Sequence, residues 1–187
     1  MLDTTTSTFS TIDTTAASVT ANDKYIGAVA VGTSVFFAPF DEDNVGVLDT
    51  TTSTFSTIDT TAAGVTATRK YWGAAAVGTS VFFAPFYEDN VKVLDTTTST
   101  FSTLSVGSLT GSAKYAGAAA VGTKIFFAPS NENSVGVLDA TTSTFSTTSA
   151  GSLTAQDKFR GAAAAGTKIF FSPHNENVGV LDTIWSA

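Results

Sequence analysis

The stretch Lys114–Pro129, KYAGAAAVGTKIFFAP, decides the fold, because close copies of it begin at Lys24, Lys70 and Lys158. Successive copies start 46, 44 and 44 residues apart. A repeat of this length is typical of one blade of a β-propeller or of a comparable solenoid unit, in which each unit completes its core against its neighbours. We therefore expect residues 1–187 to form a single domain of four repeats.

The composition favours strands and limits the classes of partner. Hydrophobic residues make up 43% of the chain and charged residues 13%, with 15 Phe, which indicates an all-β protein. The net charge of −7 disfavours binding to nucleic acid or to an anionic membrane, and no stretch approaches the roughly 18 apolar residues of a membrane span. Cysteine is absent, so the chain holds neither disulfides nor thiolate metal sites. We expect a soluble, acidic protein with no cofactor, no nucleic-acid partner and no membrane partner.

Each repeat reads as four short strands, for which the first repeat gives the pattern. The expected strands are an inner, a second, a third and an outer strand, at Tyr25–Val31, Val35–Ala38, Val45–Leu48 and Thr54–Ile58. Gly32-Thr33 suits a two-residue type II′ hairpin turn between the first two. The inner strand is rich in Gly and Ala, which leaves room where several blades converge on a narrow axis.

The second strand carries a pair of aromatic residues in every repeat and ends at a proline. In the first repeat these are Phe36-Phe37 and Pro39. Because side chains alternate along a strand, one Phe of each pair faces either side of the sheet, as expected for a blade that is buried on both faces. Proline cannot continue a central ladder, so it ends the strand.

The two ends of the chain suggest how the ring closes. The last repeat stops after its third strand, Val178–Leu181, whereas Leu2–Ile12 repeats the outer-strand segment Leu48–Ile58 residue for residue. We therefore predict a β-propeller of four four-stranded antiparallel blades, closed by pairing of Thr8–Ile12 with Val178–Leu181. This pairing would remove two exposed sheet edges.

The repeat as a whole resembles the kelch-type propeller repeat. The resemblance rests on the unit KYxGAxAVGTKIFFAP followed by VxVLDTTTSTF, and it covers essentially the whole chain. Kelch units carry a double glycine after the second strand and a tryptophan in the outer strand, where this chain has Ala-Pro and Phe55, Phe101 or Phe145. The resemblance implies a binding scaffold, and kelch-type rings usually have more than four blades.

Positions where near-identical repeats differ are candidates for function, because a shared fold does not require different residues at equivalent places. After the Lys-Tyr or Lys-Phe pair the repeats carry Ile, Trp, Ala and Arg, and after the proline they carry Phe, Phe, Ser and His. Both places fall on the face where the second-to-third and outer-to-inner connections emerge. Aromatic residues beside arginine favour a protein interface or stacking on a sugar ring. The predicted ligand-binding residues are Phe40, Trp72, Phe86, Tyr87, Arg160 and His174.

The same face should carry repeated lysines and glutamates. The lysines that begin the inner strands are expected to form solvated pairs with Glu42, Glu88, Glu132 and Glu176. A less favoured interpretation is that these glutamates bind Ca²⁺ or a similar cation. The aspartates of the Leu-Asp-Thr-Thr segments are expected to make Asx turns.

Three function classes stay open. The favoured prediction is a non-catalytic binding or interaction scaffold for a protein or carbohydrate. An alternative is a self-assembling structural protein that exchanges its N-terminal strand between chains, as an eight-bladed dimer or a filament. A second alternative is a glycan-processing enzyme, although the single histidine, His174, has no recognisable nucleophile beside it.

Overall fold

The chain is all-β in a computed structural model that describes residues 2–3 and 8–183. Blade 1 consists of β3 (Tyr25–Val31), β4 (Ser34–Pro39), β5 (Asn44–Asp49) and β6 (Thr54–Asp59). Blade 2 consists of β7 (Tyr71–Val77), β8 (Ser80–Pro85), β9 (Asn90–Asp95) and β10 (Thr100–Ser105). Blade 3 consists of β11 (Tyr115–Val121), β12 (Lys124–Pro129), β13 (Ser134–Asp139) and β14 (Thr144–Ser149). Blade 4 consists of β15 (Phe159–Ala165), β16 (Lys168–Pro173) and β17 (Gly179–Asp182).

Two short strands, β1 (Leu2–Asp3) and β2 (Thr8–Phe9), precede the blades. The helices of the described chain are two short 3-10 turns, η1 (Thr15–Ala17) and η2 (Thr61–Ala63). No helix in residues 2–3 and 8–183 is long and apolar enough to cross a membrane.

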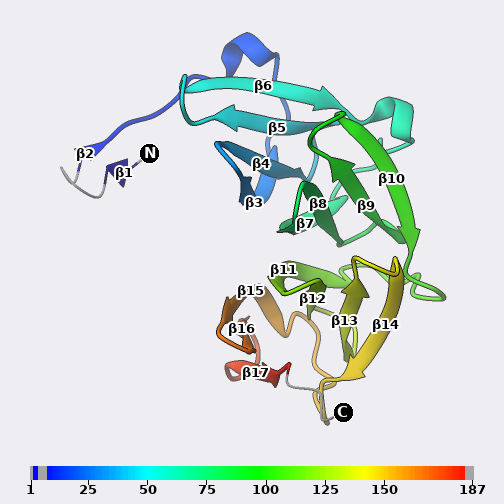
Figure 1. Cartoon of the computed structure of the whole chain (residues 1–187). Helices are drawn as coiled ribbons and strands as arrows, with labels where there is room; N and C mark the ends of the chain where they lie inside the picture. Colours follow the sequence, from blue (N-terminus) through cyan, green and yellow to red (C-terminus); the bar gives the residue numbers. More distant parts are fainter. Residues whose placement is uncertain (1, 4–7, 184–187) are drawn as a thin grey trace.

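The four blades are antiparallel meanders that follow one another around a common axis (Figure 1). Strand order within each blade is the order of the sequence, with the Gly- and Ala-rich strand innermost. This confirms the predicted all-β propeller of four repeats, with strand ends that differ from the prediction by about one residue. The inner hairpin also follows the prediction, because Gly32 has a φ of 58° and Thr33 does not share this conformation.

Each blade packs one face on the next blade and the opposite face on the preceding one. We call the first the forward face and the second the backward face. In blade 1 the forward face presents Phe36, Ala38 and Val45 to the backward face of blade 2, which presents Tyr71 and Phe83. The two residues of each Phe pair therefore lie on opposite faces, as the alternation predicted. The same packing joins blades 2 and 3, and blades 3 and 4.

The inner strands approach one another so closely that only glycine fits at one position in each of the first three. A Cβ on Gly27 would lie 2.7 Å from the Cα of Gly73, and one on Gly73 would lie 2.9 Å from the Cα of Gly117. A Cβ on Gly117 would in turn lie 2.7 Å from the Cα of Gly161. Real Cβ atoms do not approach backbone so closely, so these contacts fix the spacing of the blades at the axis.

The predicted closure by the N-terminal strand is wrong for the described chain. β2 pairs with β1, with Leu2 opposite Phe9, and blade 4 keeps three strands. Leu48 and Phe55 oppose each other in the same way in blade 1, so the N-terminal hairpin repeats the end of a blade. β2 therefore pairs with β1, the strand just before it in the sequence, and not with β17. Figure 1 shows the hairpin beyond blade 1, well away from β17, and the blades as an arc whose first and last members do not meet.

Candidate functional site: a hollow at one end of the inner strands

Buried lysines tie neighbouring blades together beneath the candidate site. Lys70, which begins blade 2, pairs through Nζ with Asp43 of blade 1 at 3.1 Å, and Lys114 of blade 3 pairs with Asp89 of blade 2 at 2.8 Å. Each Nζ also donates to a backbone carbonyl three residues earlier in the chain, at 2.5 Å. Both lysine side chains are fully buried. The prediction of solvated lysine–glutamate pairs is therefore wrong for Lys70 and Lys114, because these lysines are buried at blade junctions and their partners are aspartates of the preceding blade.

A hollow of about 510 Å³ opens above these junctions, at the ends of the inner strands where the predicted face lies. Five of the six predicted ligand-binding residues line it. They are Phe40, Trp72, Phe86, Tyr87 and Arg160, and the other lining residues are Asp23, Ile26, Arg69, Ser112, Ala113, Asn131 and Asp157. All four blades or the loops leading into them contribute.

Arg160 and Trp72 meet across the hollow. The guanidinium carbon of Arg160 lies 4.7 Å from the centre of the Trp72 ring, within the range of a cation–π interaction. An Nη of Arg160 donates to a carboxylate oxygen of Asp157 at 2.9 Å, which fixes the plane of the guanidinium group. Its Nε is buried and has no hydrogen-bond partner among the described residues. Such a donor can serve a ligand that reaches it.

The aromatic residues divide between the floor and the rim of the hollow. Phe40 and Phe86 are almost fully buried and pack against Trp72, with ring centroids 5.6 Å and 4.9 Å from the Trp72 ring. These two predicted ligand-binding residues thus belong to a buried cluster against which Trp72 packs. Tyr87 is exposed and stacks on Phe86 at 5.2 Å.

Arg69 completes a second cation–aromatic pair at the rim. Its guanidinium carbon lies 5.8 Å from the centre of the Tyr87 ring, and its Nη donates to the Tyr87 hydroxyl at 3.3 Å. This hydrogen bond raises the pKa of Arg69 above its ordinary value. The hollow therefore has two arginines, with the carboxylates of Asp23 and Asp157 close by.

His174 lies outside the lining of the hollow. Its Nδ1 is 3.2 Å from the backbone oxygen of Asp157, and the side chain is exposed. Sequence reasoning missed Arg69 and Asp157, which both precede the lysine of their inner strand. The signal was present, since this position also differs among the repeats, as Asp23, Arg69, Ala113 and Asp157.

The predicted glutamates do not gather around a point. Glu42 is buried and accepts from the backbone N–H of Ala21 at 2.5 Å, a structural contact that holds the segment before blade 1 against that blade. Among residues 2–3 and 8–183, no three His, Cys, Asp or Glu side chains are grouped so that they could hold a metal ion. The aspartates of the Leu-Asp-Thr-Thr segments make the expected Asx turns, as Asp49 does with the N–H of Thr51 at 2.8 Å.

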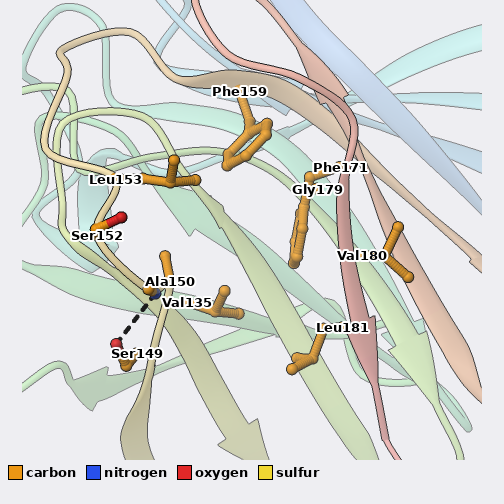
Figure 2. A pocket seen from close by; sticks show the side chains of 11 residues that line it. Val135, Ser149, Ala150, Ser152, Leu153, Phe159, Phe171, Gly179, Val180 and Leu181 are labelled. Atoms are coloured by element: carbon orange, nitrogen blue, oxygen red, sulfur yellow. Dashed lines mark hydrogen bonds between the residues drawn. The ribbon is translucent and has the colours of Figure 1, made fainter.

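A second hollow, of about 480 Å³, lies beside blade 4 where the other blades have an outer strand (Figure 2). Phe159, Phe171 and Leu181 line it, together with Leu153 from the preceding loop. In blade 3 the residues equivalent to the two phenylalanines, Tyr115 and Phe127, pack against Phe145 of the outer strand β14. Blade 4 thus has an apolar site shaped by a missing strand.

Comparisons with known proteins identify the fold. The chain is similar to the computationally designed Ika4 protein, with a TM-score of 0.61 at 12% identity over 87% of this chain and 93% of that one. It is also similar to the designed Ika8 protein, with a TM-score of 0.59 at 12% identity over 85% of this chain and 46% of that one. A third likeness is to virginiamycin B lyase from Staphylococcus aureus, with a TM-score of 0.64 at 10% identity over 86% of this chain and 56% of that one.

The fold is that of a β-propeller. The chain spans about half the length of Ika8 and of the lyase, and these low identities speak for the fold alone. No family model matches the sequence, and no curated protein matches it.

Proposed function

We propose that this propeller is a non-catalytic binding scaffold with kelch-like repeats, which takes a protein or carbohydrate ligand in the hollow around Trp72 and Arg160. The contact between these two residues is the observation that carries the proposal, because both stand at the repeat position where the inner strands differ most. Internal packing repeats from blade to blade, whereas this contact occurs once in the described chain. A ligand would be held at one place on a repetitive molecule.

The chemistry of the hollow favours a ligand with both an apolar face and a polar edge. Trp72 and Tyr87 offer ring surface, and Arg160 offers a buried Nε without a partner in the described chain. Asp23 and Asp157 add acceptors. Sugar rings and the aromatic or acidic side chains of a protein both present this combination. The overall charge of −7 supports the expectation that neither nucleic acid nor an anionic membrane is the partner.

The test is to screen the whole chain against an oligosaccharide array and a peptide array, and to repeat each positive by titration calorimetry. We expect Trp72→Ala and Arg160→Ala to weaken binding by at least about tenfold each, as hot-spot residues do. The matched control is Thr79→Ala, in an exposed inner-hairpin turn at the opposite end of the strands. Binding that both alanine variants retain at wild-type strength would place the ligand elsewhere, and no binding in either array would remove the proposal.

A second candidate function, self-assembly by exchange of the N-terminal strand, is favoured by the hollow beside blade 4. The segment Leu2–Ile12 has the sequence of Leu48–Ile58, which includes the outer strand of blade 1. Phe9 corresponds to Phe55 of that strand and is 77% exposed. Donated to another chain, Phe9 would fill the place beside Phe159 and Phe171 that Phe145 occupies in blade 3. Phe9→Ser should then lower the association constant, measured by sedimentation equilibrium, and an unchanged constant would exclude this mode of assembly.

A further inference from the structure

The forward face of blade 4 exposes apolar side chains whose counterparts are buried in the preceding blade. Phe170, Val178 and Val180 are 37%, 59% and 56% exposed. Their counterparts on the forward face of blade 3, Phe126, Val135 and Val137, are 0%, 4% and 4% exposed, because blade 4 covers them. The same apolar side chains are thus buried at a junction inside the chain and open at its end.

Within the described chain, the backward face of blade 1 likewise has no blade packed against it. Tyr25, Phe37 and Leu48 are only half-buried and line a hollow of about 400 Å³ together with Phe55. In blade 2 the equivalent Tyr71, Phe83 and Leu94 are almost fully buried against the forward face of blade 1. The side chains that receive a forward face in the interior are therefore present at the beginning of the arc, where they are only partly covered and where Ile12 and Thr14 line the same hollow.

A backbone hydrogen bond that occurs at every internal junction is missing, in the part of the chain that the structure describes, at the start of blade 1 and at the end of blade 4. At each internal junction, the N–H of the lysine that begins one blade donates to the carbonyl of the residue after the proline of the blade before it. The three bonds run from Lys70 to Phe40 at 3.0 Å, from Lys114 to Phe86 at 2.9 Å and from Lys158 to Ser130 at 3.1 Å. Among the described residues, the equivalent N–H of Lys24 and the equivalent carbonyl of His174 make no such bond.

We propose that two copies of this chain close a single ring of eight blades, in which the forward face of blade 4 of each copy packs on the backward face of blade 1 of the other. Each new junction would repeat the internal one, with Phe170, Val178 and Val180 against Tyr25 and Phe37, and with the Lys24 N–H donating to the His174 carbonyl. The single chain does not make this junction with itself, because its first and last blades lie apart (Figure 1) and the face of blade 4 stays exposed. A second copy supplies both missing faces at once, and the two identical junctions leave neither face open.

This interface is independent of the ligand proposed for the hollow around Trp72, and it differs from strand exchange in the residues that carry it. The blade faces provide the contact through side chains of the second and third strands. The hairpin of β1 and β2 leaves blade 1 on the side of the same junction, so an exchanged strand could add to the interface (Figure 1). The experiment must therefore distinguish association through the blade faces from association through the hairpin.

The test is the mass of the intact chain in solution, measured by multi-angle light scattering over a wide range of concentrations. We expect a plateau at twice the 19.2 kDa of one chain. Val180→Lys should return the mass to that of one chain, since it puts a charge into an apolar junction. The control Thr147→Lys, at an exposed position of the outer strand β14, should keep the doubled mass.

A constant mass of 19.2 kDa for the wild type, or a series that grows without a plateau, would overturn the two-chain ring. So would a doubled mass that survives both Val180→Lys and Val178→Lys. Circular dichroism identifies any variant that has failed to fold, and the two lysine variants replace residues that are already largely exposed in the single chain. A mass that falls with Phe9→Ser but not with either lysine variant would show that the exchanged strand drives assembly. It would exclude the proposed contact between the forward face of blade 4 and the backward face of blade 1.

Discussion

Arg160 stacks on Trp72 at 4.7 Å although the two residues belong to the fourth and the second blade. The equivalent residue of the blade between them is Ala116, which is fully buried and too short to separate them. The contact therefore depends on three different residues at one repeated position. A repeat with a large side chain in place of Ala116 would keep the two apart.

We expect the Arg160–Trp72 pair to show energetic coupling in a double-mutant cycle. Urea unfolding of the wild type, Trp72→Ala, Arg160→Ala and the double variant should give an interaction free energy of about 0.5–2 kcal/mol, the range of a partly desolvated cation–π pair. Additive effects of the two substitutions would show that the observed stacking does not contribute to stability.

The close approach of the inner strands predicts that Gly117 cannot be replaced without cost. Gly117→Ala places a methyl group 2.7 Å from the Cα of Gly161 at a backbone φ of 113°. Gly122→Ala is the matched control, because its φ is 58° and its added methyl group would meet nothing within 4 Å. We expect the control to lose about 1–2 kcal/mol of unfolding free energy from backbone strain, and Gly117→Ala to lose roughly 1–3 kcal/mol more from overpacking. Equal losses, measured in urea, would mean that the strands can move apart.

Replacing a buried lysine by methionine should cost more stability than the same substitution at a partly exposed lysine. Lys114→Met leaves the carbonyl oxygens of Gly111 and Tyr87 without their donor and Asp89 without its counter-ion. Its unfolding free energy should fall by about 1–3 kcal/mol. Lys124→Met removes a partly exposed pair with Asp139 and should change stability by less than about 1 kcal/mol. Thermal unfolding of both variants makes the comparison, and a larger effect at Lys124 would contradict it.

The Asx turns predict a loss of stability in acid. Hydrogen bonds from Thr51, Thr97 and Thr141 hold the pKa values of Asp49, Asp95 and Asp139 below their ordinary value of 3.8. A carboxylate whose pKa is lower in the folded state stabilises the fold above its unfolded pKa, and this stability is lost as the pH falls through the folded pKa. The wild type should therefore weaken from about pH 4 downwards, as seen in thermal melts at successive pH values.

A triple variant with asparagine at the three aspartates tests the source of that acid sensitivity. Asparagine can accept the same turn hydrogen bonds but does not titrate. Its melting temperature should change less than that of the wild type between pH 5 and pH 2, about the window in which these carboxylates take up protons. Parallel curves for the two proteins would place the acid-sensitive groups elsewhere in the chain.

Sequence periodicity predicted the blades because the determinants of a blade are local and recur four times. The Gly-Thr turn, the Phe pair and the proline each act within a few residues, and they specify the hairpin, the two buried faces and the strand end. The clustering of Trp72 with Arg160 could also be predicted from the sequence, since both occupy the same position in their repeats. Comparison of repeats with one another located this site without knowledge of the fold.

Partners of the charged side chains were less predictable, because they depend on the offset between neighbouring blades. Lys70 lies within reach of both Glu42 and Asp43 by sequence position, and the junction geometry selects Asp43. Closure failed for a related reason. Strand counting predicted that Thr8–Ile12 completes blade 4, but it does not fix which partner this strand takes. In the structure Thr8 and Phe9 pair with Asp3 and Leu2, and blade 4 keeps three strands.

The bond from the N–H of Lys70, Lys114 or Lys158 to the preceding blade has a consequence for how such a chain can change over time. The donor and acceptor are main-chain atoms, and the lysine at the junction is present in every repeat. We therefore expect that the gain or loss of one whole repeat preserves this bond without compensating substitutions, because the new neighbours already carry its donor and acceptor. The number of blades would then change by one while every junction kept its main-chain contact.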